Sequence, residues 1–270
     1  MQPVVTAIIT VYNEEKHIAE AVYSLLDQTY SNLEVLVIDD GSSDKTPDTL
    51  AGIKDSRLRV IRKNRLRRAR ALKLACEEAK GKYIANLDAD DYSYPERIAK
   101  QVAFFEANPD YAWIGCGEER VEPRRGEHIN RLYPTDNATL RKQCTRCIPY
   151  SHSGVMFRKS LIDKGINYDP KQPYLIDFEF FLRIAKKYKV ANLPEVLVRR
   201  EVRNGSFFQG RFSTSQQNRR LARFGVQSVF WFKLPPWMLV YPLARLIYPM
   251  MPDTLKRLIR KKQGLAETNV

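Results

Sequence analysis

Residues 82–91 read Lys-Tyr-Ile-Ala-Asn-Leu-Asp-Ala-Asp-Asp, a short apolar run that ends in three carboxylates. The apolar part predicts a buried strand, which would deliver the carboxylates together to the end of a sheet. Carboxylates this close repel one another unless a cation or dense solvation offsets their charge. Such oxygen ligands suit Mg²⁺ or Mn²⁺, which usually share their coordination with substrate phosphates. This stretch alone is also compatible with a polar turn, so other parts of the sequence are needed to distinguish a metal site from a turn.

Strand and helix patterns alternate through the first half of the chain. The predicted strands are residues 4–9, 33–38, 58–61 and 83–87, and the predicted helices between them are residues 14–28, 46–53 and 68–79. The first strand is a continuous apolar, β-branched run, which is typical of a strand buried on both faces. The alternation predicts an α/β fold with a doubly wound, mainly parallel, Rossmann-like sheet.

Three polar clusters follow three of these strands. They are residues 10–13, residues 39–42 and residues 88–91. In sheets of this type ligands bind outside the carboxyl ends of the strands. The three clusters therefore predict a pocket at one edge of the sheet.

The middle of the chain is mixed. The predicted elements are helices at 95–107 and 177–187 and strands at 112–116, 154–157 and 196–198. Asp177 falls in the first turn of its helix, where the helix dipole favours a carboxylate.

The C-terminal part is basic and apolar. The net charge of the chain is +14, and no acidic residue lies between Val202 and Pro252. Residues 229–241 are very apolar, residues 255–262 predict a basic helix, and several prolines rule against a simple spanning helix. Trp and Tyr mixed with Arg and Lys suit an element that lies in a headgroup layer. The alternative is an extension that packs on its own domain or on another subunit.

One other class of protein fits the sequence poorly. A nucleic-acid-binding protein would explain the positive charge but gives no reason for acidic and polar clusters at strand ends. Cys144 and Cys147 form a single C-x-x-C with no second pair. We interpret them as structural, in a reduced, intracellular chain.

Several segments together resemble family 2 glycosyltransferases with the GT-A fold. They are AIITVYNEE (7–15), SLLDQTY (24–30), VIDDGSSDKT (37–46) and AKGKYIANLDADD (79–91), with weaker matches at HSGVMFR (152–158) and DFEFFLR (177–183). The resemblance covers roughly residues 3–206. It implies transfer of a sugar from a nucleotide donor to an acceptor hydroxyl, with inversion at the anomeric carbon.

The resemblance assigns the donor nucleotide to the first two clusters. Thr10, Tyr12 and Asp40 match positions that hold the base, and Asn13 and Asp39 lie beside them. The Tyr12 ring can stack on a base. Asp40 can accept from an imino N–H, a group found in uracil, thymine and guanine alike.

The third cluster matches the Asp-x-Asp of the family. The resemblance implies that Asp90 ligates Mg²⁺ or Mn²⁺ on the donor diphosphate, with Asp88 nearer the ribose or sugar. A divalent ion stabilises the charge that gathers on the leaving diphosphate.

Asp177 matches the catalytic base, and a carboxylate there can take the acceptor proton. The residue before it is Ile176 rather than an acid, so Glu179 is an alternative base.

Other departures concern the phosphate and acceptor sides. Arg203 stands where the family often has a His, and it could offset diphosphate charge directly. His152 is a candidate acceptor contact, with a structural role as the alternative. The basic run 62–70 lacks a glycine that is often found there in the family. An arginine of this run could line the base or phosphate pocket, and we expect most of the other side chains of the run on a solvated helix face.

The resemblance thus implies an inverting, metal-dependent glycosyltransferase that uses a nucleotide-sugar, with a UDP-sugar favoured, in cell-surface or lipid-linked glycan synthesis. The alternatives are a polyprenyl-phosphate glycosyl synthase and a non-catalytic donor-binding scaffold. We predict a catalytic domain at 1–206, with a nucleotide-binding half (1–94) and an acceptor half (95–206), and an extension at 207–270. The extension would contact the anionic inner face of the cell membrane, which implies a cytoplasmic, peripheral protein. The oligomeric state is left open.

Overall fold

The computed structural model describes residues 5–122, 126–201, 214–252 and 254. The chain forms two compact units. Residues 1–140 and 148–203 make up the first unit, and residues 141–147 and 204–270 make up the second. The boundary predicted between residues 206 and 207 falls outside the described residues and stays a prediction.

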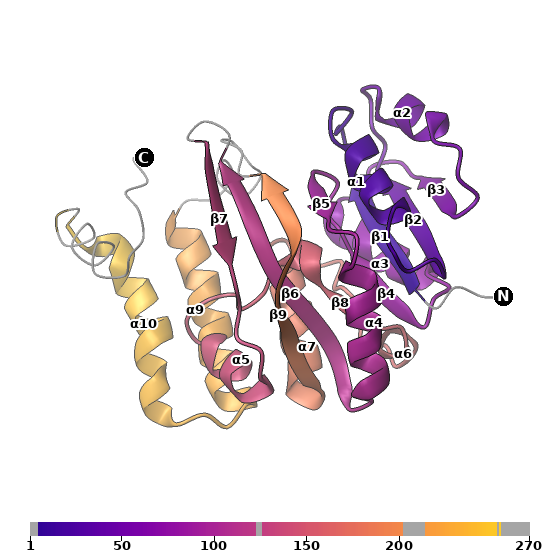
Figure 1. The fold of residues 1–270 in the computed structure, drawn as a ribbon. Coiled ribbons are helices and arrows are strands. Elements are labelled where there is room, and N and C mark those ends of the chain that lie inside the picture. The colour runs from indigo at the N-terminus through magenta and orange to yellow at the C-terminus, as the bar shows by residue number, and fades with distance from the viewer. Residues whose placement is uncertain (1–4, 123–125, 202–213, 253, 255–270) are drawn as a thin grey trace. The chain divides into compact units, whose positions relative to one another are not determined.

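The first half of the first unit alternates strands and helices (Figure 1). Its elements are β1 (Val5–Val11), α1 (Ile18–Leu26), β2 (Leu33–Asp39), α2 (Thr46–Gly52), β3 (Leu58–Arg62), α3 (Arg68–Glu78), β4 (Tyr83–Asn86) and β5 (Asp91–Ser93). The chain then continues with α4 (Arg97–Ala107), β6 (Tyr111–Glu122), β7 (Glu127–Arg131), α5 (Asn137–Gln143), the 3₁₀ helix η1 (His152–Gly154), β8 (Met156–Arg158), α6 (Ser160–Asp163), α7 (Ile176–Lys187) and β9 (Lys189–Glu201).

The strands of this unit form one sheet in the order β3-β2-β1-β4-β8-β6-β9-β5, with β7 paired to β6. The four strands β3, β2, β1 and β4 are parallel, as are β6 and β9. The α/β class and the mainly parallel sheet are thereby confirmed. The short strand β8 is antiparallel to both β4 and β6 and joins the two parallel parts.

The centre of the sheet is apolar because its strands are buried on both faces. All seven residues of β2 are buried, and β1 is buried except for Thr10. Helix α1 packs the side of Ile18, Val22 and Leu25 into this core. The polar loops that follow these strands are thus attached to a well-packed core.

Helix α1 begins four residues later than predicted. The backbone N–H of Glu14 donates to Thr46 Oγ1 at 3.0 Å, and that of Glu15 donates to Asp44 Oδ2 at 3.1 Å. Asn13 has a positive φ of 55°. Residues 13–15 are therefore held by the loop after β2 rather than by the helix.

The strand predicted at 154–157 is shifted toward the C-terminus. Residues 152–154 form η1, and β8 begins at Met156. A Cβ atom on Gly154 would lie 2.6 Å from Cys116 Sγ, so only glycine fits where η1 packs on β6. The turn fixes the position of His152.

The second unit contains α9 (Thr214–Trp231), the 3₁₀ helix η2 (Pro236–Leu239), α10 (Val240–Ile247) and the 3₁₀ helix η3 (Tyr248–Met250). Gly225 of α9 meets the Pro242 ring, where an added Cβ would come within 2.9 Å of Pro242 Cβ. The Arg146 guanidinium lies over the Tyr241 ring, 3.7 Å from its centroid. The basic helix predicted at 255–262 lies outside the described residues.

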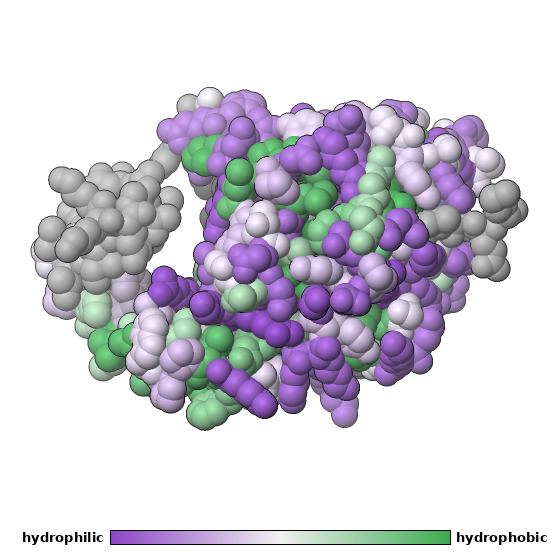
Figure 2. Space-filling model, turned by 60° about the horizontal axis from the view of Figure 1, so that its bottom comes forward, coloured by the Kyte–Doolittle hydropathy of each residue, from purple (hydrophilic) through white to green (hydrophobic). Residues whose placement is uncertain are grey.

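Much of this unit's apolar surface is exposed. Figure 2 shows green surface at the lower left of the view, in the part of the molecule where α9 and α10 lie in Figure 1. In the described ranges, none of the helices has the length and apolar character needed to cross a membrane.

Candidate active site

The loops after β1 and β2 are joined by hydrogen bonds. The backbone N–H of Asn13 donates to Ser42 Oγ at 3.0 Å, and Asn13 Oδ1 accepts from the backbone N–H of Ser43 at 2.8 Å. Val11 and Asp39 are register partners at the ends of their parallel strands. The first two predicted clusters therefore lie together at the carboxyl edge of the sheet.

Asp40 anchors the segment that leads into α3. Its carboxylate accepts from the backbone N–H groups of Leu66 and Arg67, the latter at 2.9 Å, and pairs with Arg65 Nη1 at 3.3 Å. A carboxylate offers about four lone-pair sites. Three are used here, so Asp40 keeps the capacity to accept one more hydrogen bond, such as that of a base imino group.

Tyr12 is exposed beside this carboxylate. The guanidinium of Arg65 covers its ring, with Cζ 3.2 Å from the centroid. A cation over an aromatic face is a favourable arrangement. One face of the predicted stacking ring is thus covered by Arg65. Thr10 lies nearby, partly buried near the end of β1.

Asp39, like Asp40, is almost completely buried. Its Oδ1 accepts from the backbone N–H of Ser42 at 2.9 Å, and its Oδ2 lies 3.4 Å from Arg62 Nε. Arg62 also donates to the carbonyl of Ser42 at 2.9 Å. In this structure Asp39 holds the turn that presents Asp40; a direct donor contact stays a prediction.

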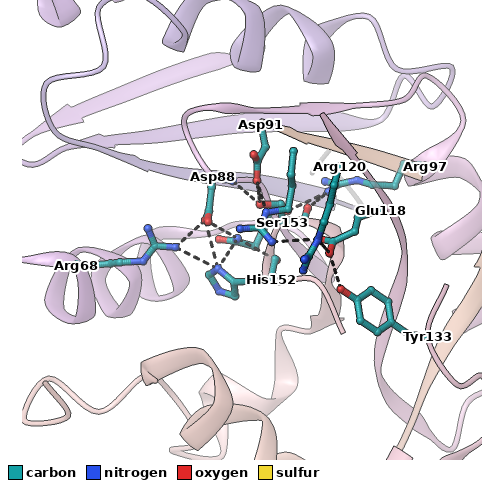
Figure 3. Close-up of polar contacts among 11 residues, drawn as sticks. Arg68, Asp88, Asp91, Arg97, Glu118, Arg120, Tyr133, His152 and Ser153 are labelled. Atoms are coloured by element: carbon teal, nitrogen blue, oxygen red, sulfur yellow. Dashed lines mark hydrogen bonds and ion pairs between the residues drawn. The ribbon is translucent and has the colours of Figure 1, made fainter. Parts of the chain in front are cut away.

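Asp88 lies at the end of β4 in a cluster with Arg68 and His152 (Figure 3). Arg68 Nη2 donates to Asp88 Oδ1 at 2.8 Å, and His152 Nδ1 lies 3.3 Å from the same oxygen. Burial would raise the pKa of the Asp88 carboxyl, but Arg68 and His152 hold that pKa well below its usual range. Asp88 is therefore ionised and has a cationic partner.

His152 is held from both sides of its ring. Its Nε2 lies 3.0 Å from Tyr168 Oη, while Asn86 Nδ2 lies 3.1 Å from its Nδ1 and donates to its backbone carbonyl at 3.1 Å. This places the imidazole within the cluster around Asp88. A contact between His152 and the acceptor stays a prediction.

The three carboxylates after β4 do not act as one group. Asp88 and Asp90 are partly exposed, whereas Asp91 begins β5 and is 5% exposed. Asp91 accepts from Ser153 Oγ and lies 3.6 Å from Arg200 Nε. Burial, together with the charges of Asp88 and Asp90, raises the pKa of Asp91 well above its usual range. The turn between β4 and β5, closed by the N–H of Asp91 donating to the carbonyl of Asp88 at 3.1 Å, thus leaves two carboxylates partly exposed and one buried.

Asp88 and Asp90 are the candidate metal ligands. Among the described residues no group of three or more His, Cys, Asp or Glu side chains could hold a metal ion. Asp88 and Asp90 supply two partly exposed carboxylates whose charges both act on Arg68. Mg²⁺ is commonly bound by one or two carboxylates together with substrate phosphates. The pair therefore fits an ion that the donor diphosphate helps to coordinate. Arg203 lies outside the described residues.

Asp177 and Glu179 lie in the first turn of α7. Asp177 Oδ2 accepts from Tyr150 Oη at 3.5 Å. Glu179 forms two hydrogen bonds with Arg183, from Nε at 2.6 Å and from Nη2 at 2.9 Å. The charges of Asp88, Asp177 and Asp90 all raise the pKa of Arg68, so Asp177 lies near the Asp88 cluster.

An ionic layer around Glu118 lies to the right of Asp88 in the view of Figure 3. Glu118 is fully buried and pairs with Arg120 at 2.7 Å, with Arg200 at 3.2 Å, and with the Tyr133 hydroxyl at 2.7 Å. Burial would raise the pKa of Glu118, but Arg200 and Arg120 lower it to about 2. Arg200 bridges this layer to Asp91.

Several members of this network were not predicted from the sequence. Arg68 stood in a basic run whose side chains were mostly expected on a solvated helix face, and its contact with Asp88 joins positions twenty residues apart. Asn86 was part of the quoted strand and was not assigned a role. Tyr150 and Tyr168 carried no recognisable motif. Their positions follow from the packing of α7 and the loop before it.

Comparison with known proteins identifies the family. The family model described as "Glycosyl transferase family 2" matches residues 6–166, more than half of the chain. The chain therefore belongs to glycosyltransferase family 2, and the predicted enzyme class is confirmed.

Two relatives cover most of this chain. A putative glycosyltransferase, EpsE, of Bacillus subtilis (strain 168) is 30% identical over 280 aligned positions, which cover 98% of this chain and 98% of EpsE. An uncharacterized glycosyltransferase of Haemophilus influenzae is 31% identical over 209 residues, or 73% of this chain and 65% of the relative. A shorter match, 44% identical over 103 residues, is to WfaP of Escherichia coli, a UDP-Glc:alpha-D-GlcNAc-diphosphoundecaprenol beta-1,3-glucosyltransferase; it covers 38% of this chain and 41% of WfaP.

Solved structures share the fold. TarS of S. aureus in complex with UDP-GlcNAc superposes with a TM-score of 0.71 at 18% identity, covering 90% of this chain and 72% of TarS. The mannosyltransferase PcManGT of Pyrobaculum calidifontis, in complex with GDP-Man and Mn²⁺, gives 0.64 at 20% identity, covering 98% and 81%. The predicted GT-A fold is thus confirmed.

Proposed function

We propose that this glycosyltransferase moves a sugar, with inversion and with the help of a divalent metal, from a nucleotide-sugar to an acceptor hydroxyl. The favoured donor is a UDP-sugar, and the acceptor is a glycan or lipid-linked glycan in surface polysaccharide synthesis. The observation that carries the proposal is the gathering of Asp88, Asp90 and Asp177 around Arg68 at the carboxyl edge of the sheet.

The donor nucleotide is assigned to the loops after β1 and β2. Asp40 retains one acceptor site for a base imino group, Tyr12 offers an aromatic ring, and Thr10 and Asn13 border them. TarS is described with UDP-GlcNAc and PcManGT with GDP-Man, so nucleotide-sugars occupy this fold in two distant proteins. These observations support a nucleotide-sugar but leave the base to experiment.

Asp90, with Asp88 beside it, would hold Mg²⁺ or Mn²⁺. When bound, the ion offsets the negative charge that develops on the leaving diphosphate. Asp88, already ionised, is suited to accept hydrogen bonds from ribose or sugar hydroxyls.

Asp177 is the proposed base. It would take the proton of the acceptor hydroxyl as the acceptor oxygen bonds to the anomeric carbon and the bond from that carbon to the diphosphate oxygen breaks. Glu179 is less suited because Arg183 already engages both of its carboxylate oxygens.

The membrane contact is assigned to a row of exposed apolar side chains on α10 and its flanking turns. The row is Trp237 (63% exposed), Val240 (55%), Leu243 (49%), Ile247 (56%) and Met250 (84%). These residues recur every three or four positions, as on one side of a helix. The sequence from 214 to 252 has five Lys and Arg residues and no acid. An apolar row within a basic segment suits the surface of an anionic membrane, where a lipid-linked acceptor would lie.

The donor site is tested by thermal stabilisation with UDP, GDP and dTDP, each with and without Mn²⁺. A ligand at about 100 times its Kd should add about 2.7 kcal/mol of stability. We expect one nucleotide to stabilise the wild type with Mn²⁺ and to stabilise Asp90→Ala much less. Stabilisation by none of the three would overturn the proposed donor site.

The acceptor is tested with the donor that this experiment identifies. Transfer to a diphosphate-linked polyprenyl glycan is expected. Transfer to a polyprenyl phosphate instead would establish the alternative synthase activity, and donor binding without any transfer would favour a scaffold.

A further inference from the structure

Arg68 is the first residue of α3, and its guanidinium lies beside the carboxylate of Asp88 (Figure 3). Its Nη2 donates to Asp88 Oδ1 at 2.8 Å and lies 3.3 Å from His152 Nδ1. Asp177 and Asp90 are also close enough for their charges to act on it. One arginine is therefore a positive centre within a group of three carboxylates.

The backbone next to Arg68 is fixed to the nucleotide side of the site. Asp40 accepts from the N–H groups of Leu66 and Arg67, and Arg67 holds a φ of 72°. The Arg68 side chain then extends from this anchored turn to Asp88, and 48% of it is exposed. It thus connects the residues proposed to hold the base with those proposed to hold the metal. A donor bound at both places has its diphosphate between them.

The charges of the site favour a cation at this point. Asp88, Asp90 and Asp177 already bring three negative charges, and a nucleoside diphosphate adds more. A single divalent ion does not offset this sum. Arginine presents a planar set of N–H donors that matches two phosphate oxygens, and its positive charge persists at every relevant pH.

We propose that Arg68 binds the diphosphate of the donor. It pairs with Asp88 while the donor is absent and turns to the phosphate oxygens when the donor binds, which releases Asp88 for hydroxyl contacts. This inference rests on the proposed function. It adds that Arg68 contributes to binding of the diphosphate even when no divalent ion is bound.

A purely structural ion pair makes a different prediction. The Arg68–Asp88 pair is half-exposed, and such pairs contribute little to stability. If Arg68 only tied α3 to β4, its loss would affect the binding of a nucleoside and of its diphosphate alike, through the shape of the site.

The experiment measures the binding of UDP and uridine, and of GDP and guanosine, by calorimetry in EDTA and in saturating Mn²⁺. The proteins are the wild type, Arg68→Gln, Arg68→Lys and the control Arg70→Gln. Arg70 lies exposed on the same helix two residues away. Thermal unfolding verifies that the variants are folded.

We expect Arg68→Gln to weaken binding of the diphosphate about tenfold or more in EDTA and less in Mn²⁺, with the nucleoside changed by less than about threefold. A charge-assisted hydrogen bond is strong enough for such a loss. Arg68→Lys should recover part of it, and Arg70→Gln should match the wild type.

Two results would overturn the inference while leaving the proposed function intact. One is wild-type binding of the diphosphate that appears only with Mn²⁺. The other is an Arg68→Gln variant that binds the diphosphate in EDTA as tightly as the wild type does, or more tightly. Failure of the wild type to bind either diphosphate under any condition would overturn both proposals.

Discussion

Asp177 and Glu179 are close in sequence but differ in surroundings. Two positions on an α-helix are rotated by about 200°, so the side chains leave α7 in different directions. Glu179 meets Arg183 one turn later, whereas Asp177 meets Tyr150 and acts on Arg68. This difference decides which carboxylate is the better candidate base.

Replacing Asp177 by Asn should lower kcat by about 10²–10⁴-fold, the usual contribution of a general base. The Kd of the donor nucleotide should stay within about threefold, because the base faces the acceptor. Glu179→Gln is the matched control and should keep most of the activity. Steady-state kinetics with nucleotide binding measures both. A larger loss for Glu179→Gln than for Asp177→Asn would reverse the assignment.

Glu118 is a buried charged residue that is linked to Asp91 through Arg200. Removing one partner of a buried pair leaves the other uncompensated, which costs about 3–5 kcal/mol. Because the Arg120 and Arg200 side chains are 35% and 42% exposed, Glu118→Gln should destabilise the protein by less than this, about 1–3 kcal/mol at neutral pH. The loss is expected because Arg120 and Arg200 would face a neutral amide.

The effect of this substitution should depend on pH. The pKa of Glu118 is lowered to about 2, below its ordinary value of 4.5, so its charge stabilises the folded state above about pH 4.5. That contribution is lost as the pH falls toward 2. The difference between wild type and Glu118→Gln in urea unfolding should be constant near neutral pH and shrink in acid. A difference that grows in acid would contradict this.

At the scale of elements, the turn from α3 to β4 depends on a glycine. A Cβ on Gly81 would lie 2.5 Å from Thr6 N and 2.7 Å from the carbonyl carbon of Val5, both backbone atoms of β1. The Thr6 hydroxyl also accepts from the N–H of Gly81 at 2.8 Å. The turn is therefore pressed directly against the neighbouring strand.

Gly81→Ala should destabilise the protein by about 1–3 kcal/mol, the usual range for overpacking. Because Asp88 and Asp90 follow β4 in the chain, donor affinity should fall as well. Gly52→Ala is the control: an added Cβ there meets no atom within 4 Å. Thermal unfolding of the two variants compares them, and equal midpoints would contradict the steric argument.

Across the whole molecule, an excess of positive charge and many exposed apolar side chains are found in the C-terminal part of the sequence. From Val196 to Val270 there are fourteen Lys and Arg residues against three acids. Attraction to an anionic surface is screened by salt, whereas apolar insertion is not. The two contributions can therefore be separated.

The full-length protein should co-sediment with vesicles that contain phosphatidylglycerol, bind neutral vesicles weakly, and be released in part by high salt. Ile247→Glu should reduce binding about tenfold, because it places a charge in the apolar row. Val60→Glu is a matched control at another exposed apolar position. Equal binding of the two variants would exclude the row as the membrane contact. A change in oligomeric state in Ile247→Glu without a change in vesicle binding would indicate a second copy as the partner.

The fold class and the polar clusters at the sheet edge were predictable from the amino-acid sequence. Buried strands read as continuous apolar runs, and the polar residues that follow them stand out because the carboxyl ends of parallel strands meet. Thr10, Tyr12, Asp40, Asp88 and Asp90 were found in this way, whereas Asp177 was predicted from the family resemblance. The ends of helices and strands were harder to predict. Helix α1 begins later than predicted because the backbone N–H groups of Glu14 and Glu15 donate to side chains of the loop after β2 and of the first turn of α2.

Which side chains meet depends on the three-dimensional fold. The contact between Arg68 and Asp88, the burial of Asp91 and the layer around Glu118 join β4, β6, β9, η1 and α3. Such contacts depend on strand order and side-chain direction, which local patterns do not encode. Periodicity tells which residues share a face, but electrostatic partners are set by distances across the fold. For this reason the sequence left open which arginine of the basic run 62–70 lines the pocket, whereas the structure places Arg68 beside Asp88.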